Sequence, residues 1–237
     1  MGIPKKNLYH FAFLMTGDRE DADRFTSDFL ETANLDDALD DARFDALIGA
    51  FARDLTDKLG RAATTSFAIL DNILRTEITR PLDPDHQEVR GSAERVRVML
   101  WELKRTCLAR VLCGLPPSVR VAFVLTVVFG YSPAAAARLL FIRESAYRVR
   151  LTRARKRVGD FLSPRCEHMD PKNPCTCEGR LVIALDHAFV RFPPHLKDTP
   201  AGDHDTSHTG TDVELLYREL PGIEPAADRD SFGEATC

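Results

Sequence analysis

The apolar residues in the first third of the chain recur with the spacing of amphipathic helices. Between Phe44 and Leu59 they fall every three or four residues, so one helical face carries all of them. The stretches "NLYHFAFLM" and "EDADRFTSDFLETA" predict two earlier helices, because the intervening "TGDRED" supplies a turn and acidic capping residues. We expect a fourth helix in "RAATTSFAILDNILRTEI".

The second apolar stripe begins after a segment rich in proline and polar residues. We predict a linker over residues 79–94, which hold two prolines and a glycine. Beyond it, apolar positions from Val96 to Val111 again follow helical spacing, and Cys107 falls among them. Cys107 is therefore interpreted as a small core residue. The prolines of "LPP" at 115–117 are expected to end this helix.

Three further segments lead from these prolines to a strongly basic stretch. "SVRVAFVLTVVFG" is almost wholly apolar, and its pattern fits a buried strand as well as a buried helix. "YSPAAAARLLF" predicts a helix with Ser132 as its N-cap and Pro133 at its first position. A short break, "IRE", separates this helix from "SAYRVRLTRARKRV" at 145–158. Because no pair of strands with a hairpin turn is apparent, we predict an all-α protein.

On a helix, residues 145–158 divide into one apolar ridge and a polar outer surface. The ridge consists of Tyr147, Leu151, Ala154 and Val158. Small polar side chains lie at the centre of the opposite face with cations on both sides, which suits a helix in the major groove of DNA. On these residues alone, a solvated basic helix or a helix that binds RNA or a membrane surface is the alternative.

The preceding Ala-rich helix and the short break complete a helix-turn-helix, whose second helix enters the major groove and contacts bases with its N-terminal residues. The predicted base-reading residues are Ser145, Arg148, Val149 and Thr152. The predicted phosphate contacts are Arg150, Arg153, Lys156 and Arg157.

Charge is distributed unevenly along the chain, whose formal net charge is −4. Residues 1–90 carry a net charge of −7, residues 91–163 carry +10, and residues 164–237 carry −7. A basic middle between acidic ends indicates an anionic partner for the middle alone, most simply nucleic acid. No Gly-rich phosphate loop and no nucleophile–base pair stands out, so we expect neither an enzyme nor a small-molecule substrate.

The segment from "LPPSVRVAFVLTVVFGYS" to "RLTRARKRV" resembles region four of the sigma-70 family, specifically of extracytoplasmic-function (ECF) sigma factors. The family pattern runs LPP-x-x-R-x-x-F-x-L, then Gly-hydrophobic-Ser, an Ala-containing helix and R-L-x-R-A-R. The resemblance implies that this domain binds the minus-35 element of promoter DNA and contacts core RNA polymerase. The matching residues are Leu115, Pro116, Pro117, Arg120, Phe123, Leu125, Gly130, Ser132, Ala137, Leu140, Ile142, Arg150, Leu151, Arg153, Ala154 and Arg155.

Two positions of the helix-turn-helix depart from this family pattern. Phe141 stands in the turn, where the family usually has glycine, and Arg143 stands where Ser or Thr usually caps the recognition helix. We therefore expect Ser145 to act as the cap, which would start the helix slightly later.

The first third of the chain resembles sigma region two, which binds the polymerase clamp and reads the minus-10 element. "LYHFAFLMTGDREDADRFTSDFLETA" resembles the opening of that region, although Ser27 stands where Gln is common in the clamp-binding helix. "FDALIGAFARDLTDKLGR" is similar to a later family segment, although Asp54 and Lys58 replace its usual Asn and Asp. The resemblance implies a sigma factor that directs core polymerase to promoters. The alternative is a helix-turn-helix regulator whose first domain does not support polymerase-dependent initiation, because its net negative charge repels DNA.

The last third of the chain is rich in proline and cysteine near its start. Cys166, His168, Cys175 and Cys177 in "CEHMDPKNPCTC" offer three thiols and an imidazole, a set that suits zinc or another soft metal ion. A redox switch at Cys175 and Cys177 and a metal-free structural loop are the alternatives. The segment resembles the Cys-rich extension of some ECF sigma factors, which implies metal-responsive control.

These patterns predict two small helical domains, 1–78 and 95–163, joined by the linker 79–94 and followed by an irregular Cys-rich tail at 164–237. Within the tail, "LVIALDHAFVRF" and "DVELLYREL" predict short helices, and we expect disorder in "KDTPAGDHDTSHTGT" and in the residues from Pro221 onward. No apolar run reaches the roughly 18 residues that cross a membrane. No signal peptide is apparent, so we expect a cytoplasmic protein without a membrane partner.

Overall fold

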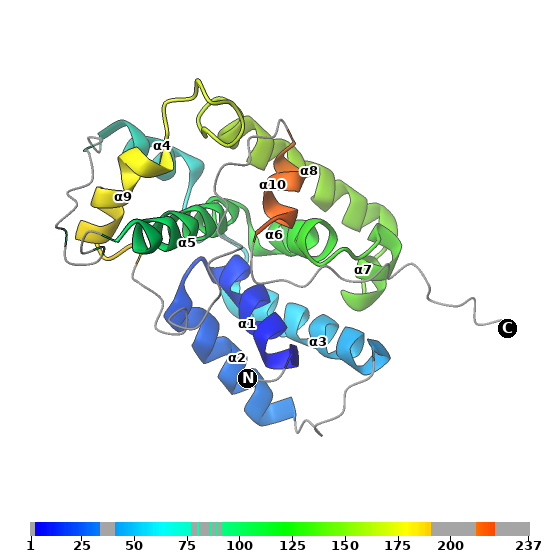
Figure 1. Cartoon of the computed structure of the whole chain (residues 1–237). Helices are drawn as coiled ribbons and strands as arrows, with labels where there is room; N and C mark the ends of the chain where they lie inside the picture. Colours follow the sequence, from blue (N-terminus) through cyan, green and yellow to red (C-terminus); the bar gives the residue numbers. More distant parts are fainter. Residues whose placement is uncertain are drawn as a thin grey trace, which may run out of the picture.

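The structure is a computed structural model that describes residues 3–33, 41–76, 80, 86, 89, 92–190 and 212–220. Within these residues the chain consists of helices and their connections and forms no strand, which confirms the predicted all-α fold (Figure 1). A single isolated β-bridge among them pairs Cys166 with Cys175.

Four helices form the first part of the chain, as the hydrophobic pattern predicts. The turn between the first two is closed by the Asp18 carboxylate, which accepts hydrogen bonds from the backbone N–H groups of Glu20 (2.9 Å) and Asp21 (3.1 Å). Gly17 precedes this turn with a φ of +66°, a left-handed conformation that favours glycine. The four helices are α1 (Ile3–Thr16), α2 (Arg19–Ala33), α3 (Asp41–Leu59) and α4 (Phe67–Thr76).

The middle of the chain is also helical, and its first helix ends before Pro116 and Pro117, as predicted. The apolar segment "SVRVAFVLTVVFG", whose pattern fitted a strand or a helix, forms an α-helix that passes into a π-helical stretch. In that stretch the N–H of Phe129 donates to the carbonyl of Val124 over 3.0 Å. The elements are α5 (Ala93–Leu112), α6 (Pro117–Phe123), the π-helix η1 (Val124–Val128), α7 (Pro133–Leu139) and α8 (Glu144–Leu162).

The first helix of the tail, α9 (Cys177–Asp186), begins four residues before the apolar stretch that predicted it. Its start is set by Thr176, whose hydroxyl accepts a hydrogen bond from the N–H of Gly179 at 3.2 Å and so caps the helix. The helix packs on α5 through a small apolar cluster that includes Leu100, Leu103 and Leu181.

The second helix of the tail, α10 (Val213–Arg218), docks on the main core, as expected from "DVELLYREL". The Tyr217 hydroxyl donates to the backbone carbonyl of Leu108 at 3.0 Å, and the Tyr217 ring packs edge-on against Phe123 with 4.9 Å between ring centroids. The two stretches for which we expect disorder, 197–211 and the residues from Pro221 onward, lie outside the described residues.

One hydrophobic core joins helices from both predicted domains. It combines buried apolar residues of α1 and α3 with those of α5 to α8 and α10. Arg120 of α6 lies inside it without exposed surface and donates to the backbone oxygen of Met15, at the end of α1. It also donates to the carbonyls of Cys113 (3.1 Å) and Leu115 (2.9 Å) and to the Thr64 hydroxyl (2.9 Å). The two predicted domain segments therefore pack against each other in this structure.

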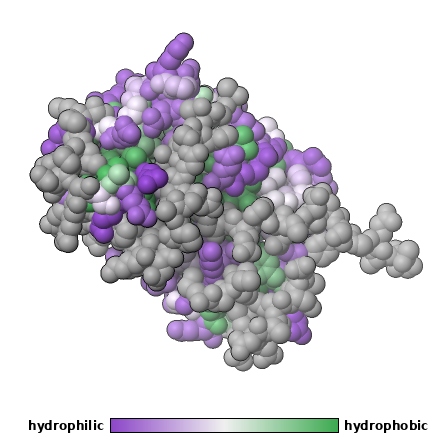
Figure 2. Space-filling model, viewed as in Figure 1, coloured by the Kyte–Doolittle hydropathy of each residue, from purple (hydrophilic) through white to green (hydrophobic). Residues whose placement is uncertain are grey.

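The surface is mostly hydrophilic over the coloured residues in the view of Figure 2, with small hydrophobic areas between them. No helix among the described residues combines the length and apolar character that crossing a bilayer requires. Two of the large apolar side chains that are exposed in the described chain, Phe141 and Val149, belong to the helix-turn-helix. Both therefore lie on the surface of the helix-turn-helix and not in the core.

Candidate nucleic-acid interface

The first helix of the helix-turn-helix, α7, starts where the sequence predicts. The Ser132 hydroxyl accepts a hydrogen bond from the N–H of Ala135 at 3.2 Å, and Pro133 occupies the first helical position. Pro133 fits there because the first N–H groups of a helix have no intrahelical partner to lose. These contacts confirm the predicted cap.

The turn between α7 and α8 requires a left-handed residue, and that residue is Phe141, with a φ of +53°. This is the position at which the family pattern has glycine. A side chain in this conformation costs about 1–2 kcal/mol relative to glycine. The Phe141 side chain is 79% exposed, so hydrophobic burial of the ring does not offset that cost.

The second helix, α8, begins at Glu144, so the expectation that Ser145 caps it is wrong. Arg143 is the N-cap residue, and it makes no side-chain capping bond. The chain turns helical one residue before Ser145, and Glu144 places a carboxylate in the first turn, where it interacts favourably with the helix dipole. The same carboxylate pairs with Arg148 one turn later, at 2.6 Å.

The predicted apolar ridge of α8 is confirmed, because Tyr147, Leu151, Ala154 and Val158 are all buried. Tyr147 anchors the ridge by donating its hydroxyl proton to the backbone carbonyl of Ala122 in α6 at 2.8 Å. Burial raises the pKa of Tyr147 well above its ordinary value, so the phenol stays protonated and remains a donor. The ridge therefore fixes which face of α8 points outward.

The outward face of α8 carries the residues predicted to contact DNA. Arg150 is half-buried, and Val149 is 50% exposed, which leaves an apolar side chain of the size that contacts a thymine methyl group. Lys156 pairs with Asp160 at 2.9 Å across one helical turn. The exposed members of the predicted set are Ser145, Arg148, Val149, Thr152, Arg153, Lys156 and Arg157.

Arg155 lies on the same helix but has a partner that the sequence did not indicate. Its Nε lies 2.6 Å from a carboxylate oxygen of Glu214, in α10. This ion pair fastens the C-terminal helix to the edge of α8. Only the docking of α10 brings the two residues together, because they are 59 positions apart in the sequence.

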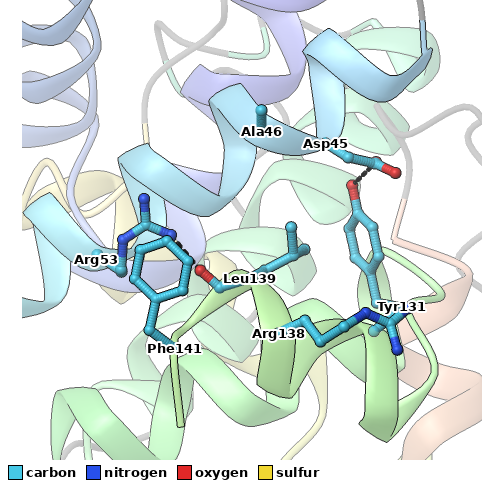
Figure 3. A pocket seen from close by; sticks show the side chains of 8 residues that line it. Asp45, Ala46, Arg53, Tyr131, Arg138, Leu139 and Phe141 are labelled. Carbon is cyan, nitrogen blue, oxygen red and sulfur yellow. Dashed lines mark hydrogen bonds between the residues drawn. The ribbon is translucent and has the colours of Figure 1, made fainter. Parts of the chain in front are cut away.

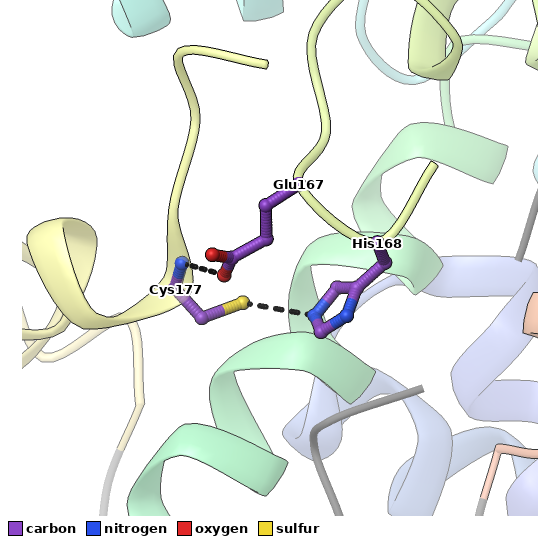
Figure 4. Close-up of side chains that lie close together, drawn as sticks. All are labelled: Glu167, His168 and Cys177. Carbon is purple, nitrogen blue, oxygen red and sulfur yellow. Dashed lines mark hydrogen bonds between the residues drawn. The ribbon is translucent and has the colours of Figure 1, made fainter. Parts of the chain in front are cut away.

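Two of the four predicted metal ligands meet directly at the start of the tail. The Sγ of Cys177 lies 3.4 Å from the Nε2 of His168, and the Glu167 carboxylate accepts a hydrogen bond from the Cys177 N–H (Figure 4). Potential ligand atoms of Glu167, His168 and Cys177 all lie within 4.8 Å of one another. Glu167 was not predicted, although its position next to His168 was a signal available in the sequence.

The other two predicted ligands are neighbours through the backbone. The Cys175 N–H donates to the carbonyl of Arg165 at 3.0 Å, and the Glu167 N–H donates to the carbonyl of Cys175 at 3.1 Å, so Cys166 and Cys175 lie side by side. The ligand atoms that the structure brings together are those of Glu167, His168 and Cys177, whereas Cys166 and Cys175 are neighbours through their backbone.

Cys107 of α5 is a further thiol beside this loop. It is half-buried, and burial together with the neighbouring Cys175 and Cys166 raises its pKa far above the ordinary value. Burial likewise raises the pKa of Cys166 to about 11. The sequence indicated a core role for Cys107, because helical spacing cannot show that the tail folds back across α5.

The comparisons with known proteins bear on the segment that contains α7 and α8. Residues 105–158 match the family model described as sigma-70, region 4. No curated protein and no solved structure gives a significant match to the chain. The helix-turn-helix formed by α7 and α8 therefore lies in a segment that matches sigma-70 region 4, a DNA-binding domain of transcription.

Proposed function

We propose that the chain is an RNA polymerase sigma factor of the ECF type, which directs core polymerase to promoters and binds the minus-35 element through α8. The observation that carries this proposal is the division of α8 into a buried ridge and a cationic outer face, within the segment that matches region 4. Promoter DNA and core RNA polymerase are the partners that a region 4 domain implies.

Binding by α8 combines electrostatic attraction with base contacts. Arg153 and Arg157 are exposed and reach phosphates, where each contact releases condensed counterions. Arg148 gives up its exposed pairing with Glu144, worth about 0.3–0.5 kcal/mol, for the O6 and N7 atoms of a guanine. The weak ion pairs on this face thus hold the cations in place without competing strongly with DNA.

Run-off transcription with core polymerase and a promoter template tests this function. The wild-type chain is expected to produce transcripts, and the double variant Arg153→Ala with Arg157→Ala is expected to reduce them at least tenfold, because two phosphate contacts are lost. Lys172→Ala removes an exposed cation of the tail and serves as the matched control. A wild-type chain that yields no transcript with any promoter template contradicts the proposal.

A helix-turn-helix regulator without polymerase function is the second candidate. It is favoured by the acidic N-terminal segment, since residues 1–90 carry a net charge of −7. Promoter-fragment binding that needs no core enzyme and gives no transcript would select this candidate.

We also propose that the tail holds zinc or a similar soft metal ion, bound by Cys166, His168, Cys175 and Cys177. The 3.4 Å separation of the Cys177 Sγ and the His168 Nε2 supports this proposal. Two tetrahedral ligands at about 2.3 Å (sulfur) and 2.0 Å (nitrogen) from zinc lie roughly 3.5 Å apart. Such an ion would hold the loop against α5, beside Cys107.

Metal content per purified chain, measured by mass spectrometry, tests this site. We expect one equivalent in the wild type and its loss in the double variant Cys175→Ser with Cys177→Ser. Cys113→Ala removes a core thiol that lies beside Gly17 and is expected to keep the metal. Cys107→Ala tests whether Cys107 binds the metal or only lies beside the site, because the removal of a ligand lowers the metal affinity at least tenfold. A wild-type chain that holds no metal after purification and after reconstitution with zinc would contradict the site.

A further inference from the structure

Two elements outside the helix-turn-helix hold α8 in place. Before the start of α8, Arg53 of α3 lies over the Phe141 ring, 4.0 Å from the ring centroid, and donates to the backbone carbonyl of Leu139 (Figure 3). Along its second half, α10 lies beside α8 and contacts it through Glu214 (Figure 1). The outward side chains of α8 are therefore presented from a fixed backbone.

The ion pair between Arg155 of α8 and Glu214 of α10 uses two nitrogen atoms and two oxygen atoms. The Arg155 Nε lies 2.6 Å from the Glu214 Oε1, and the Arg155 Nη2 donates to the Glu214 Oε2 at 3.1 Å. A two-pronged contact of this kind is stronger and more definite in geometry than a single charged contact. Arg155 is thus directed toward α10.

The Glu214 carboxylate is positioned by α10 itself. Leu216 and Tyr217 are buried in the core and dock the helix, and the Asp212 carboxylate caps it by accepting a hydrogen bond from the Glu214 N–H at 2.8 Å. Arg218, one turn along, lies 3.4 Å from the same Glu214 carboxylate. Because the carboxylate is fixed in advance, its pair with Arg155 loses less side-chain entropy than a pair of two mobile surface chains.

Arg148 and Arg155 lie on the same side of α8, because seven residues make almost two helical turns. Both are paired with carboxylates, but the two pairs differ. The pair of Arg148 with Glu144 lies within one helix, and its side chains are 63% and 43% exposed. The pair of Arg155 with Glu214 joins two elements, and the Glu214 side chain is only 25% exposed, so salt screens this pair less. DNA therefore displaces the partner of Arg148 more readily than that of Arg155.

We propose that Glu214 of α10 sets the strength of DNA binding, because it withholds Arg155 from the phosphate backbone. This inference rests on the proposed function, which places DNA on α8. A cation that reaches a phosphate releases condensed counterions from DNA, and a cation that stays paired with a protein carboxylate does not. The C-terminal helix thus lowers the affinity of α8 for DNA and the salt dependence of binding.

Glu214→Gln is the decisive variant, because it removes the charge and keeps the size of the side chain. The released Arg155 is expected to add one phosphate contact, which steepens the slope of log K against log salt by about 0.9. Affinity is expected to rise about fivefold at about 100 mM salt, and this gain shrinks about threefold between about 50 and 200 mM salt.

Glu219→Gln is the matched control for charge. Glu219 is the exposed C-cap residue of α10, so this variant makes the same change in net charge on the same element. It is expected to keep the wild-type slope. If both variants steepen the slope equally, net charge and not the ion pair is responsible, and the proposal is overturned.

Arg155→Ala tests the other partner of the pair. It is expected to keep the wild-type slope, because a withheld Arg155 makes no phosphate contact, and to cancel the effect of Glu214→Gln in the double variant. A shallower slope in Arg155→Ala would show that Arg155 already contacts DNA. A steeper slope in the double variant would show that Glu214 acts without Arg155, and either result overturns the proposal.

Fluorescence anisotropy of the full chain on a labelled duplex of arbitrary sequence measures these slopes, because phosphate contacts do not depend on sequence. Hydrogen exchange of residues 212–220, followed by mass spectrometry, is expected to be the same in Glu214→Gln and in the wild type. Faster exchange there would assign the gain to undocking of α10 and overturn the role of the pair.

The same titration distinguishes failure of this inference from failure of the proposed function. A wild-type chain that binds the duplex, with Glu214→Gln no tighter, overturns the inference alone. A wild-type chain that shows no binding even at about 50 mM salt, where the electrostatic attraction is strong, overturns DNA binding by α8 and the inference with it.

Discussion

Arg120 joins the two halves of the molecule through a single side chain. Its guanidinium donates to oxygen atoms at the end of α1, in the loop before α4 and in the turn before α6, and burial lowers its pKa. It remains charged all the same, because an arginine pKa lies far above neutrality. The sequence pattern marked this position as a family match, but only the fold shows that its partners come from the N-terminal segment.

Arg120→Met is expected to lower the free energy of unfolding by about 3 kcal/mol or more. The variant keeps most of the side-chain volume but leaves several buried carbonyl oxygens without a donor. Urea denaturation measures the change, with Lys172→Met as an exposed control within about 0.5 kcal/mol of wild type. A loss below about 1 kcal/mol for Arg120→Met would show that water replaces the guanidinium.

His10 gives the protein a predicted sensitivity to acid. It is buried in α1, and burial, with Arg105 and Lys6 nearby, lowers its pKa to about 3. Below pH 6.5 His10 is protonated in the unfolded chain, whereas in the folded chain it stays neutral down to about pH 3. The free energy of unfolding therefore falls as the pH falls through this window. Between pH 7.5 and 5.5 the His10 contribution to this loss is about 1.4 kcal/mol.

Urea denaturation of wild type and His10→Leu at both pH values isolates this contribution. The variant is expected to lose about 1.4 kcal/mol less than wild type on acidification. Equal losses in the two proteins would mean that His10 titrates normally in the folded state.

At the scale of single elements, α8 separates the residues that hold the helix from those that face outward. Most of this division was predictable from sequence, because a helix of known period has only one way to bury Tyr147, Leu151, Ala154 and Val158 together. The starting residue of α8 was not predictable in this way. The stabilisation that Ser145 would give as an N-cap and the stabilisation that Glu144 gives in the first turn differ by less than about 1 kcal/mol.

Arg153→Ala is expected to weaken DNA binding by a similar factor on every sequence and to flatten its salt dependence. Each lost phosphate contact lowers the slope of log K against log salt by about 0.9. Fluorescence anisotropy on a promoter fragment between about 50 and 200 mM salt measures this slope. Thr152→Ala, a predicted base contact, should instead change the preferred sequence and keep the slope, and the reverse pattern would exchange the two roles.

At the scale of the whole molecule, ion pairs connect the N-terminal segment to α5 and to the start of the tail. Arg19 pairs with the buried Glu102 of α5, Arg110 of α5 pairs with Asp18 at 3.4 Å, and Arg165 pairs with Asp71 at 2.6 Å. The net charges of −7 for residues 1–90 and +10 for residues 91–163 agree with the Arg110–Asp18 pair, but sequence alone gives no means of pairing residues 83 to 94 positions apart. The shared core was unpredictable for the same reason, since each amphipathic helix has several possible partners.

The shared core predicts one cooperative unfolding transition for the helices it contains. Trp101, the single tryptophan of the chain, is buried in α5 and reports the surroundings of that helix. Its fluorescence and the far-ultraviolet circular dichroism are expected to give the same urea midpoint. Midpoints that differ by more than about 0.3 M, given the usual slope of 1–3 kcal/mol per molar urea, would show that the two predicted domains unfold separately.

The docking of α10 affects how the Cys-rich extension can be studied genetically. Leu216 and Tyr217 are part of the main core, where Tyr217 covers Phe123 and binds the backbone of α5. A stop codon placed after α8 therefore removes part of the core packing together with the three cysteines of the loop. Loss of function in such an allele can then result from misfolding as well as from loss of the metal site. Alleles that alter single cysteines and leave 212–220 intact separate the two effects.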